Sequence, residues 1–142
     1  AEIVAAALPN QTVEEEGDLR EIIPGEADGM TREDYTARFG AFNLLAEPDR
    51  PFAPGGESWR AFITRVETFH RRLAEKYAGQ TVLAVTHAGF IVASFLTRFA
   101  VPRPGTGAQI DPDFTGLTEW QIHQGIWRLM RYNDTSHKGH NQ

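Results

Sequence analysis

The most regular hydrophobic pattern in the chain lies between residues 59 and 77. Positions three and four apart share one face of an α-helix, so such a pattern predicts an amphipathic helix, which Gly79 would end. His70 falls among the charged positions of this helix, and we expect its side chain to face solvent. The apolar stripe consists of Trp59, Phe62, Ile63, Val66, Phe69, Leu73 and Tyr77.

A different pattern follows directly. Residues 81–86 read Thr-Val-Leu-Ala-Val-Thr, a short uncharged run rich in β-branched side chains. Such a run predicts a strand that is buried on both faces. From about Gly89 to Phe99 the spacing is helical again, and Pro102 would end this helix. His87 therefore stands where a predicted strand passes into a predicted helix.

The other predicted elements are shorter. Helices are expected from Glu2 to Leu8 and from Thr31, as its N-cap, to about Ala46, and two strands at residues 114–122 and 126–132. Loops rich in Pro and Gly separate them at residues 48–56 and 102–112. The order of helix, strand, helix and hairpin predicts one mixed α/β domain of packed layers over residues 1–142.

Composition and charge narrow the classes of function. Of the 142 residues, 14 are Lys or Arg and 19 are Asp or Glu, so the net charge is −5, which argues against a nucleic-acid surface. There is no cysteine, which excludes disulfides, thiolate catalysis and cysteine-ligated zinc. No apolar stretch approaches the ~18 residues of a membrane span, so we expect no membrane partner and take the cytoplasm as the default location.

The position of His87 has a chemical meaning. In open α/β sheets, ligands bind beyond the carboxyl ends of strands, where helix N-termini expose unpaired N–H groups and favour negative charge. Ala88 and Gly89 are small, so a ligand can approach their backbone closely. A phosphate at this point would meet both the imidazole and the helix start. The alternative, a structural histidine bonded to a nearby carbonyl group, stays open at this level.

Four short motifs carry a family resemblance. Thr86-His87-Ala88-Gly89 after an apolar strand resembles the second histidine motif of the histidine phosphatase superfamily, which includes phosphoglycerate mutases. Three further segments agree with that family in order and spacing. They are Leu19-Arg20-Glu21 with Gly25–Thr31, Gly55-Gly56-Glu57-Ser58 at a helix start, and Asn133-Asp134-Thr135-Ser136-His137.

The resemblance implies a fold and a set of roles. The fold would be a three-layer α/β/α phosphoglycerate mutase-like sheet, and the reaction would pass through a phosphohistidine on a histidine of an Arg-His-Gly motif. Glu21 occupies the position of the general acid, His87 that of the second catalytic histidine, and the Ala88 N–H would bind the phosphoryl group. The substrate would be a small phosphorylated molecule, and no cofactor is implied. Glu57 is expected to cap its helix, and Arg20 and Arg65 are weaker candidates for substrate-side cations.

The chain departs from the family pattern at one important point. It contains no Arg-His-Gly, and Ala27 stands where the family usually has tryptophan. Ala1 opens a helix without a capping residue, so we expect that an upstream segment is missing and that the sheet is incomplete at the N-terminus. This truncated domain should be inactive alone. The apolar edges left by a missing strand would favour self-association, for instance as a homodimer.

Other interpretations remain beside the phosphatase. They are mutase-type phosphoryl transfer, which has little room for the family's insertions, and a catalytically dead module that binds a phosphorylated ligand. A serine hydrolase using Ser58 or Ser94 is disfavoured because no Gly-x-Ser-x-Gly elbow occurs. A metal site at His137 and His140 is disfavoured because both lie in a polar tail and a metal needs more ligands.

Overall fold

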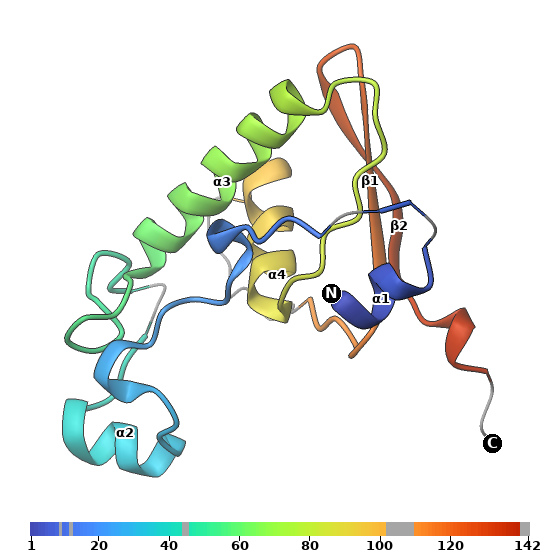
Figure 1. Cartoon of the computed structure of the whole chain (residues 1–142). Coiled ribbons are helices and arrows are strands. Elements are labelled where there is room, and N and C mark those ends of the chain that lie inside the picture. The colour runs from blue at the N-terminus through green and yellow to red at the C-terminus, as the bar shows by residue number, and fades with distance from the viewer. Residues whose placement is uncertain (9, 12, 44–45, 102–109, 140–142) are drawn as a thin grey trace.

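The computed structural model describes residues 1–8, 10–11, 13–43, 46–101 and 110–139, and four α-helices and one hairpin organise them. In Figure 1, α3 and α4 lie beside the hairpin, while α2 lies at the far end of the molecule. The helices are α1 (Glu2–Ala6), α2 (Arg32–Phe39), α3 (Trp59–Lys76) and α4 (Ala88–Arg98). The strands are β1 (Leu117–His123) and β2 (Ile126–Asp134), and short 3-10 turns are η1 (Gly17–Leu19), η2 (Gly25–Ala27) and η3 (Ser136–Lys138).

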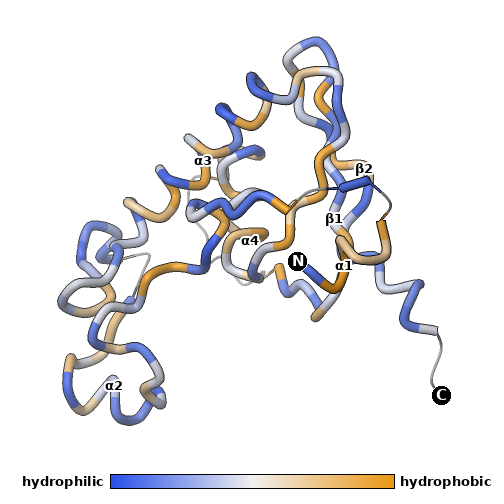
Figure 2. The backbone as a smooth tube through the Cα atoms, viewed as in Figure 1, coloured by the Kyte–Doolittle hydropathy of each residue, from blue (hydrophilic) through white to orange (hydrophobic). Residues whose placement is uncertain are grey.

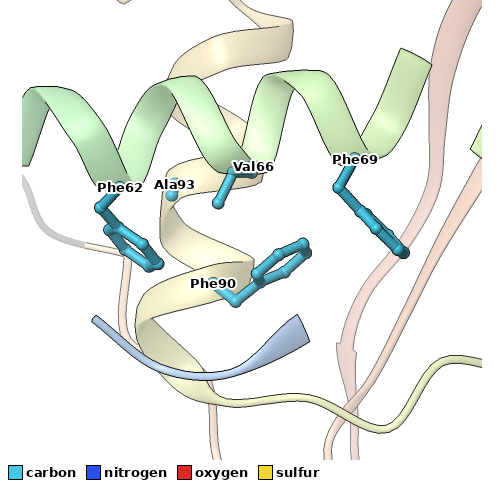
Figure 3. Close-up of a cluster of buried hydrophobic side chains, with 5 residues drawn as sticks. All are labelled: Phe62, Val66, Phe69, Phe90 and Ala93. Atoms are coloured by element: carbon cyan, nitrogen blue, oxygen red, sulfur yellow. The ribbon is translucent and has the colours of Figure 1, made fainter. Parts of the chain in front are cut away.

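The main core lies between α3 and α4. The apolar stripe predicted for residues 59–77 forms α3 and packs on the small side chain of Ala93 and the ring of Phe90 (Figure 3). Phe69 meets Phe90 edge-on, with ring centroids 5.6 Å apart. This packing fixes where α4 begins, and therefore where His87 lies. The buried members of the cluster are Phe62, Val66, Phe69, Phe90 and Ala93.

The hairpin closes one side of these two helices with aromatic side chains. Strands β1 and β2 pair antiparallel, with His123 opposite Ile126 across the turn. Trp120 and Tyr132 lie 5.2 and 5.0 Å from Phe95 of α4, measured between ring centroids. Both strands were predicted, and the structure confirms them.

A second, smaller cluster surrounds α2. Tyr35 lies among aromatic neighbours and donates a hydrogen bond of 2.6 Å from its hydroxyl to the Phe52 carbonyl oxygen. The predicted N-cap is confirmed, since Thr31 Oγ1 accepts from the Asp34 N–H at 3.1 Å. The helix ends at Phe39 and not near Ala46, because Gly40 takes a left-handed φ of 81° that stops it.

The predicted strand at residues 81–86 is not a strand in this structure. The segment is extended but pairs with no other strand among the described residues. Nor is it buried on both faces, since Val82, Leu83 and Val85 keep 42%, 54% and 50% of their surface exposed. An apolar, β-branched run forms a strand only where a neighbour accepts its main-chain hydrogen bonds. Pro102 and most of the predicted loop 102–112 lie outside the described residues.

Candidate active site

His87 stands at the N-terminus of α4. Its backbone is extended (φ −112°, ψ 162°), its carbonyl oxygen accepts the Ile91 N–H at 3.1 Å, and its side chain makes no capping hydrogen bond. The residue is exposed, and so is Ala88 after it. The imidazole of His87 and the N–H of Ala88, the first residue of α4, therefore lie at an exposed position.

Glu21 reaches this helix start from a distant part of the sequence. Its Oε2 accepts the Gly89 N–H at 2.9 Å, and its Oε1 accepts the N–H of the adjacent Ile22 at 2.9 Å. The carboxylate thus lies where the helix N-terminus favours negative charge. A second contact joins the same segments, because Thr86 Oγ1 donates to the Leu19 carbonyl oxygen at 2.5 Å. The structure therefore brings the Glu21 carboxylate to the start of the helix that follows His87.

Gly89 is required for this approach. A Cβ built on Gly89 would lie 2.1 Å from Glu21 Oε1 and 2.7 Å from its carboxyl carbon. Sequence reasoning treated Gly89 only as a small residue near a ligand. Its contact with Glu21 could not be found from local spacing, since 68 positions separate the two residues.

Replacing Gly89 with alanine is expected to push the Glu21 carboxylate away from the helix start. Losing a hydrogen bond to a charged acceptor should lower the free energy of unfolding by about 1–2 kcal/mol. Urea unfolding and a crystal structure of Gly89→Ala would measure both effects. Gly17→Ala is the matched control, because nothing lies within 4 Å of a Cβ there. A Glu21–amide bond that persists in Gly89→Ala would contradict the prediction.

A nearly buried ion pair holds the backbone that carries Glu21. The Arg65 guanidinium on α3 bonds both Glu57 oxygens at 2.8 and 2.7 Å, and the two side chains are only 10% and 14% exposed. Arg65 also donates to the carbonyl oxygens of Asp18, Arg20 and Glu21, at 2.6, 3.1 and 3.2 Å. Arg65 therefore binds Glu57 and the backbone of the protein itself, and it is not a free substrate-side cation.

Glu57 does not cap its helix, contrary to expectation. Ser58 caps α3 through its Oγ, which accepts the Ala61 N–H at 3.2 Å, while Glu57 Oε2 accepts the Ile23 N–H at 3.0 Å. Burial raises the pKa of Glu57, but the hydrogen bonds from Arg65 and Ile23 outweigh it, so the pKa lies below its ordinary value. Glu57 is thus an ionised anchor for the segment after Glu21.

Gly56 of the Gly-Gly-Glu-Ser motif allows the backbones of two loops to come into contact. The Glu57 N–H donates to the Ile23 carbonyl oxygen at 2.8 Å, and the Glu26 N–H donates to the Pro54 carbonyl oxygen at 2.9 Å. A Cβ on Gly56 would come within 2.9 Å of the Ile23 carbonyl oxygen. The motif therefore fixes the far end of the Glu21 segment through main-chain contacts.

The expectation that His70 faces solvent is wrong. The side chain is buried (5% exposed) and lies against Phe90 and Trp127, because the hairpin packs over this part of α3. Ser94 Oγ donates to the Phe90 carbonyl oxygen at 2.8 Å and lies 3.2 Å from His70 Nε2, so Nε2–H is the donor to Ser94. Burial, together with the positive charge of Arg98, lowers the pKa of His70 to about 4.

Because of the lowered pKa of His70, we expect the protein to lose stability in mild acid. Unfolding returns the pKa of His70 from about 4 to about 6.5, so between these values the unfolded chain binds the extra proton. The free energy of unfolding should therefore fall as the pH drops from 6.5 to 4, by about 3 kcal/mol for this group. Urea titrations at several pH values would measure the slope in the native protein and in His70→Gln. The variant should show a flatter slope, whereas His123→Gln, at the exposed end of β1, should not. Equal slopes in all three proteins would contradict this role of His70.

The weaker candidates form no site within the part of the chain that the structure describes. His137 Nε2 lies 3.3 Å from Thr115 Oγ1, and His140 lies outside the described residues. Within the described ranges, no three His, Cys, Asp or Glu side chains are grouped so that they could hold a metal ion. Ser94 is buried and contacts His70 instead of His87, and Ser58 serves as the helix cap.

Two hollows of the described surface, one along α3 and one on α2, lie away from Glu21 and His87. An open depression of about 550 Å³ runs along the outer face of α3 between Asp49, Arg60 and Thr68. Neither Glu21 nor His87 lines it. We base the assignment of the site on the hydrogen bonds at the start of α4, since the depression is open to solvent and two of its charged lining residues, Arg60 and Asp49, pair with each other.

Comparison with known proteins agrees with this geometry. The family model of the histidine phosphatase superfamily (branch 1) matches residues 1–135. The chain belongs to the histidine phosphatase superfamily. A solved structure of YhfR from Bacillus stearothermophilus matches with a TM-score of 0.76 at 19% identity, covering 94% of this chain and 67% of that one. No curated protein sequence matches the chain.

For this histidine phosphatase superfamily member, the match to YhfR confirms the predicted α/β class and phosphoglycerate mutase-like fold. The family is one of enzymes that transfer or hydrolyse phosphoryl groups, so a phosphatase-like or mutase-like function follows in general terms. No helix among the described residues is both long and apolar enough to cross a membrane.

Proposed function

We propose that this chain supplies the general acid and the phosphoryl-binding groups of a phosphomonoester hydrolase. Glu21 would give a proton to the leaving oxygen, and His87 with the Ala88 N–H would bind the phosphoryl oxygens. The observation that carries the proposal is the 2.9 Å hydrogen bond from the Gly89 N–H to Glu21 Oε2, two residues after His87, in a chain of this superfamily. Phosphoryl transfer needs chiefly positioning and electrostatic stabilisation, which a helix N-terminus and an imidazole provide.

The nucleophile has to come from an Arg-His-Gly segment, which the 142 residues do not contain. In the proposed first step, the histidine nitrogen of that segment bonds to phosphorus, the P–O ester bond breaks, and Glu21 protonates the departing oxygen. In the second step, Glu21 takes a proton from water, whose oxygen displaces the histidine and releases phosphate. We therefore propose that the 142 residues alone do not turn over substrate.

The chain as it stands can test the binding half of this proposal. Titration with inorganic phosphate should shift the amide resonances of Ala88 and Gly89 in ¹H–¹⁵N spectra, and His87→Ala should abolish the shifts. His137→Ala is the control. His137 belongs to the C-terminal end of the described chain, and its imidazole contacts Thr115 and not α4. Shifts that survive in His87→Ala, or no shifts at all, would count against phosphate recognition at α4.

The proposed hydrolysis of the phosphate ester requires a second experiment. A denaturing intact-mass spectrum of purified material would show whether a peptide with Arg-His-Gly accompanies the chain. Material with that peptide should hydrolyse an aryl phosphate, and material without it should not. Transfer of phosphate to an alcohol acceptor instead of water would favour the mutase. Phosphate binding without turnover, in material that does contain Arg-His-Gly, would favour the catalytically dead binding module.

A further inference from the structure

Four consecutive carbonyl groups of the segment that ends at Glu21 accept hydrogen bonds from side chains. The Leu19 carbonyl oxygen accepts from the Thr86 hydroxyl at 2.5 Å, and Thr86 directly precedes His87 in the sequence. The other three accept from Arg65 of α3, and they belong to Asp18, Arg20 and Glu21. The segment is therefore held from two sides, by α3 and by the backbone that leads to His87.

Thr86 is the polar end of an apolar run. Residues 82–85 read Val-Leu-Ala-Val, and none of these side chains can donate a hydrogen bond. In Figure 2 the hydrophobic colouring continues along this stretch of backbone down to the start of α4. Valine has the same branched shape as threonine, so the apolar pattern would admit valine in place of Thr86. What distinguishes Thr86 is its hydroxyl, and that hydroxyl is bonded to the Glu21 segment.

The Thr86 bond joins the two backbones close to both candidate catalytic side chains. Leu19 lies two residues before Glu21, and Thr86 lies one residue before His87. His87 itself is placed by α4, whose Phe90 is buried in the core that α4 shares with α3. Because this packing fixes the start of α4, the hydroxyl ties the Glu21 backbone to a fixed point.

A second hydrogen bond depends on this attachment. The Gly89 N–H donates to Glu21 Oε2 at 2.9 Å, and the Thr86 and Gly89 bonds are the two that join the described residues 13–24 to residues 81–101. Gly89 lies in the first turn of α4, where an N–H has no partner within the helix. The Gly89 bond therefore reports how well the Glu21 carboxylate is positioned.

We propose that Thr86 is a positioning residue, whose hydroxyl holds the Glu21 carboxylate at the start of the helix that follows His87. It acts on Glu21 through the backbone of Leu19. A general acid has to lie within hydrogen-bond reach of the oxygen that it protonates, so a displacement of about 1 Å can lower turnover by about 10²-fold. The part of this inference that concerns turnover rests on the proposed function, whereas the placing of Glu21 does not.

Hydrogen exchange of the Gly89 amide, followed by NMR, tests the placing of Glu21 in the chain as it is. Thr86→Val removes the hydroxyl and keeps the shape of the side chain, so the Gly89 amide should exchange faster by about tenfold or more. Thr86→Ser returns a hydroxyl and should restore the slower exchange. Circular dichroism would check that each variant keeps its fold.

Thr97→Val is the matched control for this measurement. It removes another half-buried hydroxyl of α4, which donates to the Ser94 carbonyl oxygen at 3.0 Å, and it should leave the Gly89 amide unchanged. Unchanged exchange of Gly89 in Thr86→Val would overturn the proposal, and so would exchange that is equally fast in Thr86→Ser.

Kinetics test the consequence for turnover, in material that contains an Arg-His-Gly segment. Thr86→Val should lower kcat for an alkyl phosphate by about 10–100-fold and leave KM within about threefold, because the position of Glu21 serves protonation of the leaving oxygen and not binding. The loss for p-nitrophenyl phosphate should be smaller, since its leaving oxygen is a weaker base. Thr86→Ser should recover most of the activity on both esters.

The kinetic outcomes separate the positioning role from the proposed function. Equal losses on the two esters in Thr86→Val, or losses in Thr86→Ser as large as those in Thr86→Val, would overturn the positioning role. Unsubstituted protein that contains Arg-His-Gly and hydrolyses neither ester would overturn the proposed function. The exchange of the Gly89 amide would then decide by itself whether Thr86 places Glu21.

Discussion

Glu21→Gln is expected to lower kcat for an aryl phosphate by about 10²–10⁴-fold, in material that contains an Arg-His-Gly segment. Glutamine keeps the size and one carbonyl oxygen, which can accept the Gly89 N–H as Oε2 does at 2.9 Å, but its NH2 group cannot accept the Ile22 N–H as Oε1 does. It cannot give a proton to the leaving oxygen, so the variant should fold and bind but should not protonate the product alcohol. Steady-state kinetics with p-nitrophenyl phosphate and with an alkyl phosphate would measure the loss. The alkyl ester should suffer more, because its leaving oxygen is more basic.

Glu26→Gln is the matched control for this experiment. Glu26 is an exposed glutamate five residues away whose Oε2 accepts from Arg38 Nη2 at 2.6 Å. Its substitution should leave kcat within about twofold, since an exposed ion pair contributes little. Full activity of Glu21→Gln on both esters would show that Glu21 is not the general acid. Its role would then be limited to capping the helix.

Arg65→Met is expected to lower the free energy of unfolding by about 3–5 kcal/mol, a large part of the stability of a domain this size. The substitution leaves the Glu57 carboxylate buried without its cation, and it removes the donor to the carbonyl oxygens of Asp18, Arg20 and Glu21. Urea unfolding followed by circular dichroism would measure the loss. Where the variant stays folded, the amide resonance of Gly89 should also move, because the backbone of Glu21 loses its anchor.

Two further variants separate this effect from a general sensitivity of α3. Arg60→Met removes the Arg60–Asp49 ion pair of the same helix, in which both side chains are largely exposed, and should cost at most about 1 kcal/mol. Adding Glu57→Gln to Arg65→Met should recover part of the stability, since the second change removes the unpaired buried charge. Equal losses in Arg60→Met and Arg65→Met would contradict the anchoring role.

Hydrophobic spacing determined the local elements of this chain. The stripe from Trp59 to Tyr77 became α3, Thr31 became a helix cap, and the run near His123 became a hairpin. These features depend on residues a few positions apart, which the 3.6-residue and two-residue periods describe directly. The same local patterns placed His87 at a helix start. The family motifs then indicated that Glu21 acts with His87 in catalysis.

Only the tertiary structure decided the features that join distant residues. His70 became buried because the hairpin, some fifty residues later, covers that face of α3. Arg65 and Glu57 became anchors because α3 passes beside the Glu21 segment. Residues 81–86 pair with no strand among the described residues although their sequence is typical of a buried strand, since a strand needs a neighbour that its own sequence does not specify. Periodicity tells which side chains share a face, and packing alone decides what that face meets.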